Sequence, residues 1–269
     1  MPELPEVENV ARRLREMTVG LTIRSVDVLD SKLDHLLCEP SLSGATIQDV
    51  VRHGKFLALR LDGARVLLMH MMMSGRILLR SADHPPDDYL RVAFILDRQI
   101  QIRFCDPRRF GTAKLIGPGE YTDFQSRLGI EPFSTRFTTT NIARRFESRT
   151  VAIKTALLNQ SIVAGVGNIY ADEALWRARV NPLFPAGELK REQVASLVRA
   201  VRRVLRDGLK SGGTTFSRYA DADGRPGTNQ LNLNVFRRPG QPCPRCGAPV
   251  EGKSIGSRTS HFCPYCQQR

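Results

Sequence analysis

The first residues of the chain, Met1-Pro2-Glu3, carry the types with the clearest chemical potential. Removal of Met1, which is usual before a small residue, would leave Pro2 with a secondary amine at the chain terminus. An α-amino group titrates near ~8, against ~10.4 for a lysine side chain, so a useful fraction is a nucleophile at neutral pH. Glu3 could move protons beside that amine if the site desolvates it. Taken alone, these residues favour a simpler interpretation, a terminus stiffened by Pro2 and Pro5.

The amine gains significance if the protein binds a sugar. Attack on a sugar C1′ carbon would give a covalent iminium intermediate. An iminium made from a secondary amine carries a fixed positive charge, so it withdraws electrons and acidifies the neighbouring C2′ proton. The remaining residues decide whether such a substrate is present.

Composition points to a polyanion partner. The chain has 269 residues, a formal net charge of +13, a pI of about 10.0 and an ordinary hydrophobic fraction of 41%. Basic charge of this size favours nucleic acid over a membrane. No stretch approaches the ~18 uninterrupted apolar residues of a membrane span, and acidic residues at the N-terminus do not fit a signal peptide. We expect a cytoplasmic protein, associated with the nucleoid through DNA.

Four of the six cysteines form two Cys-x-x-Cys motifs near the C-terminus: Cys243, Cys246, Cys263 and Cys266. Two motifs at this separation supply four thiolates for one tetrahedral Zn²⁺, and a reducing compartment disfavours the alternative of two disulfides. So small a module cannot build its own core, so the metal is expected to be structural. Between the motifs we expect a β-hairpin whose tip carries Lys253 and Arg258. Cys38 and Cys105 are expected to be structural thiols.

Periodicity predicts an α+β protein. Residues 5–18 show helical spacing, and the region up to residue 116 contains short apolar segments without intervening helices, which favours an antiparallel sandwich. Its strands are expected at Thr22–Leu29, Thr46–Val51, Lys55–Leu61, Arg65–Met71, Arg76–Arg80, Leu90–Leu96 and Ile100–Phe104. Later residues read as helices at Thr140–Ser148, Ile153–Asn159, Ala171–Ala178 and Leu189–Leu209, followed by a mobile loop over 214–234.

Several loops carry residues suited to DNA. Gly165-Val166-Gly167-Asn168 lies between two short helices, where backbone N–H groups and an amide can approach phosphate, although a lone Gly-x-Gly is more often a turn. The Met71-Met72-Met73 run is core by default, yet one Met projecting from the turn could wedge into a base stack. Asp106-Pro107-Arg108-Arg109-Phe110 offers cations and an aromatic wedge. Lys55 could meet a phosphate, or simply be solvated.

Together these segments resemble the formamidopyrimidine-DNA glycosylase / endonuclease VIII family of DNA repair enzymes. The resemblance covers nearly the whole chain and runs in family order through PELPEVE, HGKFL, HMMMSGRI, DPRRFG, IKTALLNQSIVAGVGNIYADE, GGTTF and the C-terminal cysteines. Leu4 and the DPRRFG loop look like the formamidopyrimidine/8-oxoguanine branch. The resemblance implies an N-terminal helix with an antiparallel β-sandwich, a helical helix-two-turns-helix domain and a zinc β-hairpin, over residues 1–130, 131–234 and 235–269.

The resemblance also implies a role for individual residues. Pro2 would be the Schiff-base nucleophile, Glu3 the general acid/base and Glu6 an active-site acid, with Lys55 on a phosphate near the lesion. Met73, Arg108 and Phe110 would fill the gap left by the extruded nucleotide, with Arg108 reading the orphaned base. The bent backbone would be held by Lys154, Asn168 and Arg258. The GGTTF segment and the loop after it would cover the flipped base.

Three stretches depart from the family pattern. A His-containing stretch usually precedes the strand before DPRRFG, whereas this chain has Asp88-Tyr89-Leu90-Arg91-Val92, so a phosphate contact is expected to pass to Arg91. The common Val-Tyr-Gly-Arg is replaced by Val235-Phe236-Arg237-Arg238. The lesion-covering loop, Ser217-Arg218-Tyr219-Ala220-Asp221-Ala222, also differs from the family pattern. These departures bear on the lesions accepted more than on the chemistry.

The sequence thus predicts a monomeric bifunctional DNA glycosylase/AP lyase that acts on double-stranded DNA with oxidised purines or abasic sites. It would remove the base and then cleave the strand by β,δ-elimination. Two alternatives stay open: an oxidised-pyrimidine enzyme of the endonuclease VIII branch, and a non-catalytic damaged-DNA-binding protein. The Pro2-Glu3 pair argues against the second, because binding alone needs no terminal amine.

Overall fold

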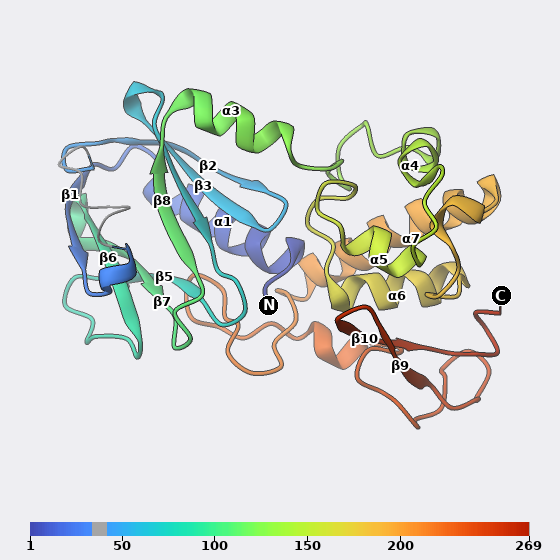
Figure 1. Ribbon diagram of the computed structural model, residues 1–269. Coiled ribbons are helices and arrows are strands. Elements are labelled where there is room, and N and C mark those ends of the chain that lie inside the picture. The colour runs from blue at the N-terminus through green and yellow to red at the C-terminus, as the bar shows by residue number, and fades with distance from the viewer. Residues whose placement is uncertain (34–41, 269) are drawn as a thin grey trace. The chain divides into compact units, whose positions relative to one another are not determined.

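Figure 1 shows the computed structural model, which describes residues 1–33 and 42–268. Cys38, for which we predict a structural thiol, lies outside the described residues. The described chain divides into two compact units, residues 1–127 with 209–230 and residues 128–208 with 231–269. Residues 209–230 therefore complete the unit that begins the chain.

Within its described residues, the first unit contains two four-stranded antiparallel sheets, ordered β1-β6-β7-β5 and β2-β3-β4-β8. The predicted β-sandwich is confirmed, and each predicted strand agrees with an observed one to within two residues at either end. The strands are β1 Ile23–Val28, β2 Ile47–His53, β3 Phe56–Leu61, β4 Val66–His70, β5 Arg76–Ser81, β6 Leu90–Leu96, β7 Ile100–Cys105 and β8 Thr112–Ile116.

Helix α1, Leu4–Thr18, packs against β2 and β3. Its apolar stripe, Val7, Val10 and Leu14, is fully buried in a core shared with both sheets. Full burial of such side chains contributes about 1.5–3 kcal/mol each. The core therefore fixes the start of the chain against the sheets.

The second unit contains four predicted helices: α4 Thr139–Phe146, α5 Ile153–Leu158, α6 Asn168–Ala178 and α7 Arg191–Lys210, whose last two residues belong to the first unit. The Oγ1 of Thr138 caps α4 by accepting a hydrogen bond from the N–H of Asn141 (3.2 Å). α6 is buried on nearly every side and packs against the predicted hairpin, β9 Glu251–Ile255 with β10 Arg258–Phe262. Arg258 lies beside the hairpin turn, and Lys253 lies within β9.

Helix α3, Pro118–Ser126, and strand β8 were not predicted. Helix α3 has no buried residue, so no apolar stripe reveals it; only Pro118 at its first turn is a start signal. Strand β8 has five residues, too few for alternation to be distinctive. Among the described helices, none combines the length and apolar character that crossing a membrane would require.

Candidate active site and nucleic-acid interface

The N-terminal residues are buried and held in place. Pro2 is buried, and Glu3 is 2% exposed. The N–H of Glu3 donates to Oε2 of Glu6 (2.8 Å), and the N–H of Val7 donates to the carbonyl of Glu3 (3.0 Å). Chain termini are usually loose unless something ties them down. Here the residues that would carry the amine and the proton shuttle have fixed positions.

Glu6 ties this terminus to the segment after α7. Its Oε1 accepts a hydrogen bond from the N–H of Thr214 (2.7 Å), and the Tyr219 hydroxyl donates to carbonyl oxygens of Glu6 (3.3 Å) and Gly212 (3.1 Å). Burial, then the Glu6 charge, raises the pKa of Tyr219, so its hydroxyl stays protonated. Gly213 has a φ of +91°, and a Cβ there would lie 3.0 Å from the Glu6 side chain. The carboxylate thus holds two distant segments together.

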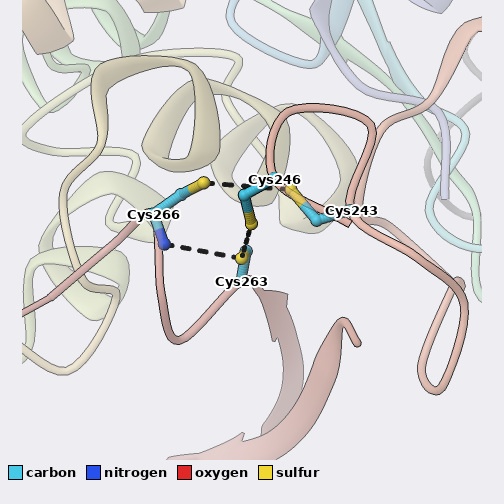
Figure 2. A group of neighbouring side chains, drawn as sticks. All are labelled: Cys243, Cys246, Cys263 and Cys266. Atoms are coloured by element: carbon cyan, nitrogen blue, oxygen red, sulfur yellow. Dashed lines mark hydrogen bonds between the residues drawn. The ribbon is translucent and has the colours of Figure 1, made fainter. Parts of the chain in front are cut away.

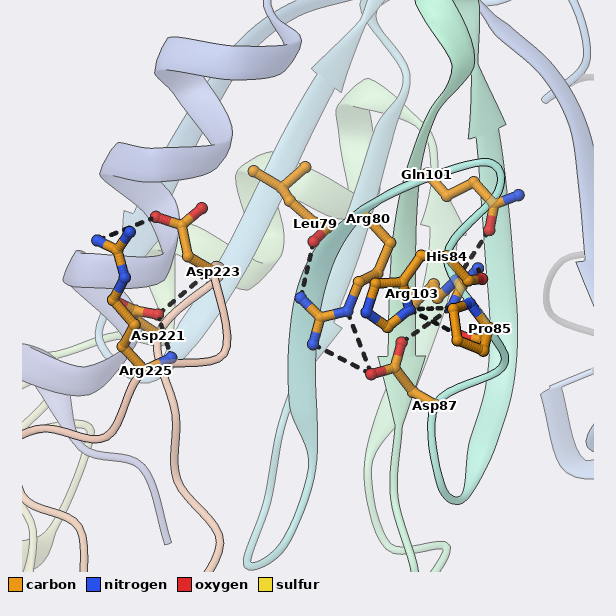
Figure 3. Close-up of polar contacts among 10 residues, drawn as sticks. All are labelled: Leu79, Arg80, His84, Pro85, Asp87, Gln101, Arg103, Asp221, Asp223 and Arg225. Atoms are coloured by element: carbon orange, nitrogen blue, oxygen red, sulfur yellow. Dashed lines mark hydrogen bonds and ion pairs between the residues drawn. The ribbon is translucent and has the colours of Figure 1, made fainter.

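Residues 221–225 anchor the same segment on the edge of β5. The N–H of Leu79 donates to the carbonyl of Ala222 (2.7 Å), and Arg13 of α1 pairs with Asp223 (2.9 Å). Figure 3 shows this turn on one side of Leu79, with a second polar cluster on the other side. In that cluster the buried Arg103 and its neighbour Arg80 donate hydrogen bonds to the loop before β6. The acceptors are the carbonyl oxygens of His84 and Pro85 and the carboxylate of Asp87. The loop predicted over 214–234 contains no strand or α-helix; its mobility stays a prediction.

The three residues predicted to fill a vacated base position lie together. Met71 is 2% exposed and belongs to the core, whereas Met73 is 44% and Phe110 46% exposed. The Nη1 of Arg108 lies 3.6 Å from the sulfur of Met73, and its guanidinium lies 4.7 Å from the ring centre of Phe110. A cation flanked by two exposed apolar groups has the composition expected of a wedge into a base stack.

Asp106, which the sequence analysis did not single out, organises this cluster. It is 1% exposed and accepts hydrogen bonds from the Ser74 hydroxyl (2.6 Å) and from the N–H groups of Arg108, Phe110 and Gly111 (3.1, 2.8 and 2.8 Å). Burial alone would raise the pKa of the Asp106 carboxyl, but these donors outweigh it and lower the pKa. One carboxylate therefore joins the loop of Met73 to the loop of Arg108 and Phe110.

Replacing Asp106 with Asn is expected to lower the free energy of unfolding by about 2–4 kcal/mol, because the amide cannot accept all four donors. Excision should fall by roughly 10–100-fold as the wedge residues lose their shared support. Urea unfolding and single-turnover cleavage measure the two effects. Asp83→Asn, an exposed acid in a neighbouring loop, is the control and should match the wild type. Unchanged stability of Asp106→Asn would contradict the assignment.

The two adjacent arginines of the DPRRFG loop differ in their contacts. Arg109 turns to Asp30, with Nε–Oδ2 and Nη2–Oδ1 distances of 2.9 and 2.5 Å. Hydrogen bonds from Arg109 lower the pKa of Asp30 against the effect of burial. Arg91, predicted to contact a phosphate, donates from Nε to the carbonyl of Asp106 (2.7 Å). Arg109 and Arg91 therefore support the loop that presents Arg108; the phosphate contact of Arg91 stays a prediction.

Lys55 lies in the tight turn between β2 and β3 and is 6% exposed. The charge of Lys55 acts on the buried His70. The Nδ1 of His70 accepts a hydrogen bond from the N–H of Met72 (2.9 Å). Burial, reinforced by the charge of Lys55, lowers the pKa of His70 to about 4. The imidazole is therefore neutral at physiological pH and adds no second positive charge beside Lys55.

The depressed pKa of His70 predicts a loss of stability in acid. Between pH ~6.5 and ~4 the unfolded chain binds a proton here that the folded chain does not, so stability is full above this window and falls within it. From pH 7 to pH 5 the unfolding free energy should drop by about 2 kcal/mol through this group. His70→Gln should remove that part of the drop, and exposed His84→Gln should not. Equal pH profiles for His70→Gln and wild type would contradict the prediction.

In the second unit, the three predicted backbone-binding residues surround one point of the hairpin. Asn168 starts α6, and its Nδ2 donates to the carbonyl of Thr259 (3.2 Å). Arg258, which precedes Thr259 in the sequence, is exposed. Lys154 is fully buried, and its Nζ lies 2.7 Å from Oδ1 of Asp172. Arg258 is thus exposed in this structure and Asn168 is half-buried, whereas Lys154 is covered; all three phosphate contacts stay predictions.

The four predicted zinc ligands converge, as Figure 2 shows. Their sulfur atoms all lie within 4.8 Å of one another, with 4.0 Å between Cys243 and Cys266 and 3.5 Å between Cys246 and Cys263. A tetrahedron with Zn–S bonds of ~2.3 Å requires sulfur separations of roughly 3.8 Å, so the site fits Zn²⁺. The Trp176 indole donates to Cys243 Sγ (3.3 Å). This and nearby backbone N–H groups outweigh burial and lower the pKa of Cys243 to about 6. The first-unit Cys105 is buried, and burial raises its pKa to about 11, as suits a structural thiol.

The structure explains one departure and connects two others. Arg237 has a φ of +58°, a conformation that glycine adopts readily, which accounts for the Gly common at this place in the family pattern. Just before Arg237, the N–H groups of Asn234, Val235 and Phe236 donate hydrogen bonds to the carboxylate of Glu173. The sequence did not predict this role of Glu173. In the first unit the Arg218 guanidinium lies 5.2 Å from the ring centre of Tyr89.

Comparisons with known proteins cover the same regions. The family descriptions "Formamidopyrimidine-DNA glycosylase N-terminal domain", "Formamidopyrimidine-DNA glycosylase H2TH domain" and "Zinc finger found in FPG and IleRS" match residues 1–113, 128–220 and 240–269. Formamidopyrimidine-DNA glycosylase of Herpetosiphon aurantiacus is 41% identical over 99% of this chain and 100% of its own length.

Two solved structures are similar over their whole length. The MutM (Fpg) protein of Thermus thermophilus is 41% identical with a TM-score of 0.89, covering 99% of this chain and 98% of that one. The Lactococcus lactis Fpg in complex with DNA containing an abasic site is 32% identical with a TM-score of 0.90, covering 99% and 100%. With its β-sandwich, helical unit and four-cysteine zinc site, this chain belongs to the formamidopyrimidine-DNA glycosylase family.

Proposed function

We propose that this protein is a bifunctional DNA glycosylase/AP lyase of base excision repair, which removes oxidised purines such as 8-oxoguanine and formamidopyrimidines from double-stranded DNA. The observation that carries the proposal is the buried N-terminus, in which Pro2 and Glu3 are held by the core and by Glu6. Chain termini are usually loose unless they are tied down, so a terminus held in this way is suited to present a reactive amine.

In the proposed reaction the amine of Pro2, once Met1 is removed, attacks C1′ of the damaged nucleotide. The C1′–N bond breaks, and the base leaves with the electron pair and a proton. Glu3 moves protons to and from the sugar as the ring opens and the iminium forms. Loss of the acidified C2′ proton expels the 3′ phosphate, and a second elimination expels the 5′ phosphate. Glu6 holds both Glu3 and Thr214 through backbone N–H groups, which supports a positioning role for this acid.

Base removal requires the nucleotide to leave the stack, at a cost of a few kcal/mol. The exposed Met73, Arg108 and Phe110 are suited to replace it, and Lys55 to bind a phosphate nearby. The second unit adds Asn168, Arg258 and the zinc hairpin as DNA contacts. Zn²⁺, when bound by the four cysteines, is structural, because all four tetrahedral positions are taken by protein ligands. We propose that the protein acts as a monomer in the cytoplasm, on the DNA of the nucleoid.

The lesion preference is the finer part of the proposal. A mutant of the similar Lactococcus lactis protein has been solved with DNA containing Fapy-dG, and the wild type with DNA containing an oxidised pyrimidine. The oxidised-pyrimidine activity of the endonuclease VIII branch is therefore the alternative to test directly. The Tyr89–Arg218 contact joins two stretches that depart from the family pattern, and it supports a lesion spectrum of this chain's own.

Borohydride trapping tests both parts. The protein is incubated with duplexes that carry 8-oxoguanine opposite C, an oxidised pyrimidine or an abasic site, and the reduced adduct is mapped by mass spectrometry. We expect a cross-link at Pro2, strongest with 8-oxoguanine. A cross-link only with the oxidised pyrimidine would move the protein to the alternative branch. Absence of any adduct at a free Pro2, even with the abasic site, would refute the enzymatic proposal.

A further inference from the structure

The second unit contains a buried ion pair between helices α5 and α6. Lys154 of α5 is 0% exposed and Asp172 of α6 is 1% exposed, and their charged atoms are 2.7 Å apart. Removing both charges from water is costly, and apolar residues of similar volume often serve stability better. A role in fixing one arrangement of the surrounding backbone explains a pair of this kind more readily than stability does.

The backbone that the pair holds is that of β10. The Nζ of Lys154 donates to the carbonyl of Thr259 (3.0 Å), the same oxygen that receives the Asn168 amide. The Oδ2 of Asp172 accepts from the N–H of His261 (2.9 Å) and lies 3.1 Å from its Nδ1. The pair therefore binds the backbone of β10 at Thr259 and His261, the residues on either side of Ser260. Thr259 directly follows the exposed Arg258.

We propose that Lys154 and Asp172 are positioning residues for DNA binding, which fix β10 and thereby aim Arg258 at the phosphate backbone. The inference rests on the proposed function and changes one part of it, the direct phosphate contact expected of Lys154. The Lys154 charge is matched inside the protein by Asp172. A phosphate could recruit it only by leaving that carboxylate buried without its partner, which is strongly unfavourable.

Asp172→Asn gives the first test. An effect of local charge alone and a positioning role predict opposite changes in DNA affinity for this variant. If the local charge alone matters, removing an acid from a DNA-binding unit strengthens binding. If Asp172 positions β10, its loss weakens binding, and we expect roughly tenfold. Affinity is measured on a duplex carrying a tetrahydrofuran abasic-site analogue, with the wild type and an undamaged duplex in parallel.

A double-mutant cycle gives the second test. If the pair acts through Arg258, Asp172→Asn should add little to the loss already caused by Arg258→Gln, whereas a general loss of stability would add in full. Salt dependence gives the third. Arg258→Gln should reduce the slope of log affinity against log salt by about 0.9. Adding Lys154→Gln to Arg258→Gln should not reduce the slope further, because Lys154 makes no phosphate contact of its own. Lys154→Arg keeps a charge that suits a phosphate but places a larger, planar group at a fully buried position, so it should behave like Lys154→Gln.

The outcomes separate cleanly. Three outcomes would each overturn the inference: tighter binding by Asp172→Asn, full additivity with Arg258→Gln, or a slope reduced by a further ~0.9 when Lys154→Gln is added to Arg258→Gln. Zinc content and thermal unfolding confirm that each variant is folded. If Lys154→Gln does not fold, the Asp172→Asn sign and the cycle still decide. Failure of the wild type to prefer the abasic duplex would instead count against the proposed function.

Discussion

Replacing Pro2 with Gly is expected to lower base excision by at least ~10³-fold while binding of an abasic-site duplex changes little. Glycine leaves a terminal amine but removes the ring that makes it secondary and pre-sets its backbone. The iminium with its fixed positive charge is then not formed. Single-turnover cleavage of an 8-oxoguanine duplex and fluorescence anisotropy measure the two quantities. Glu3→Gln should show the same separation of excision from binding, because the amide cannot carry a proton.

The control for the terminus is Pro5→Ala. Pro5 is buried in the first turn of α1, and alanine is compatible with helix at that place. Its excision rate should stay close to that of the wild type, which shows that disturbing the terminus alone does not remove activity. Normal excision by either Pro2→Gly or Glu3→Gln would disprove the role assigned to that residue.

Replacing Cys263 with Ser is expected to remove the bound Zn²⁺ and to weaken binding of the abasic duplex by at least ~100-fold, because metal binding supplies the folding energy of such small modules. Cys263 is fully buried, so an unpaired hydroxyl in its place adds a desolvation cost. Metal content by atomic absorption and binding by anisotropy give the result.

Cys105→Ser is the matched control for zinc. Cys105 is also buried, but it ends β7 in the first unit and belongs to no group of ligands among the described residues. It should retain a full equivalent of Zn²⁺. Undiminished metal in Cys263→Ser, or equal metal loss in both variants, would contradict a four-thiolate site.

Features that depend on local pattern could be predicted from the sequence. The stripe of Val7, Val10 and Leu14 required a helix with one buried face, and two Cys-x-x-Cys motifs required a common metal. These patterns repeat at short range, so neighbouring residues suffice to reveal them. The resemblance added what periodicity cannot give, the helix-two-turns-helix arrangement and the order of the functional motifs.

Features that depend on distant partners could not be predicted. Arg108 and Arg109 are adjacent and identical in type, and it is the tertiary contact of Arg109 with Asp30 that distinguishes them. In the sequence Asp106 is only one residue of the DPRRFG motif. Its role depends on four hydrogen-bond donors from two loops, which only the structure reveals. Lys154 is read from the sequence as a cation for DNA because nothing local reveals that Asp172 covers it. In each case the deciding contact is a tertiary one.

The placement of residues 209–230 bears on how the protein is made. The core of the first unit includes Ala222, and Thr214 donates its backbone N–H to the Glu6 carboxylate. These residues emerge from the ribosome only after most of the helical unit. Domains usually fold in order of synthesis. The Glu6 carboxylate can meet its Thr214 partner only late in synthesis, so we expect the first unit to complete its fold when the chain is nearly finished.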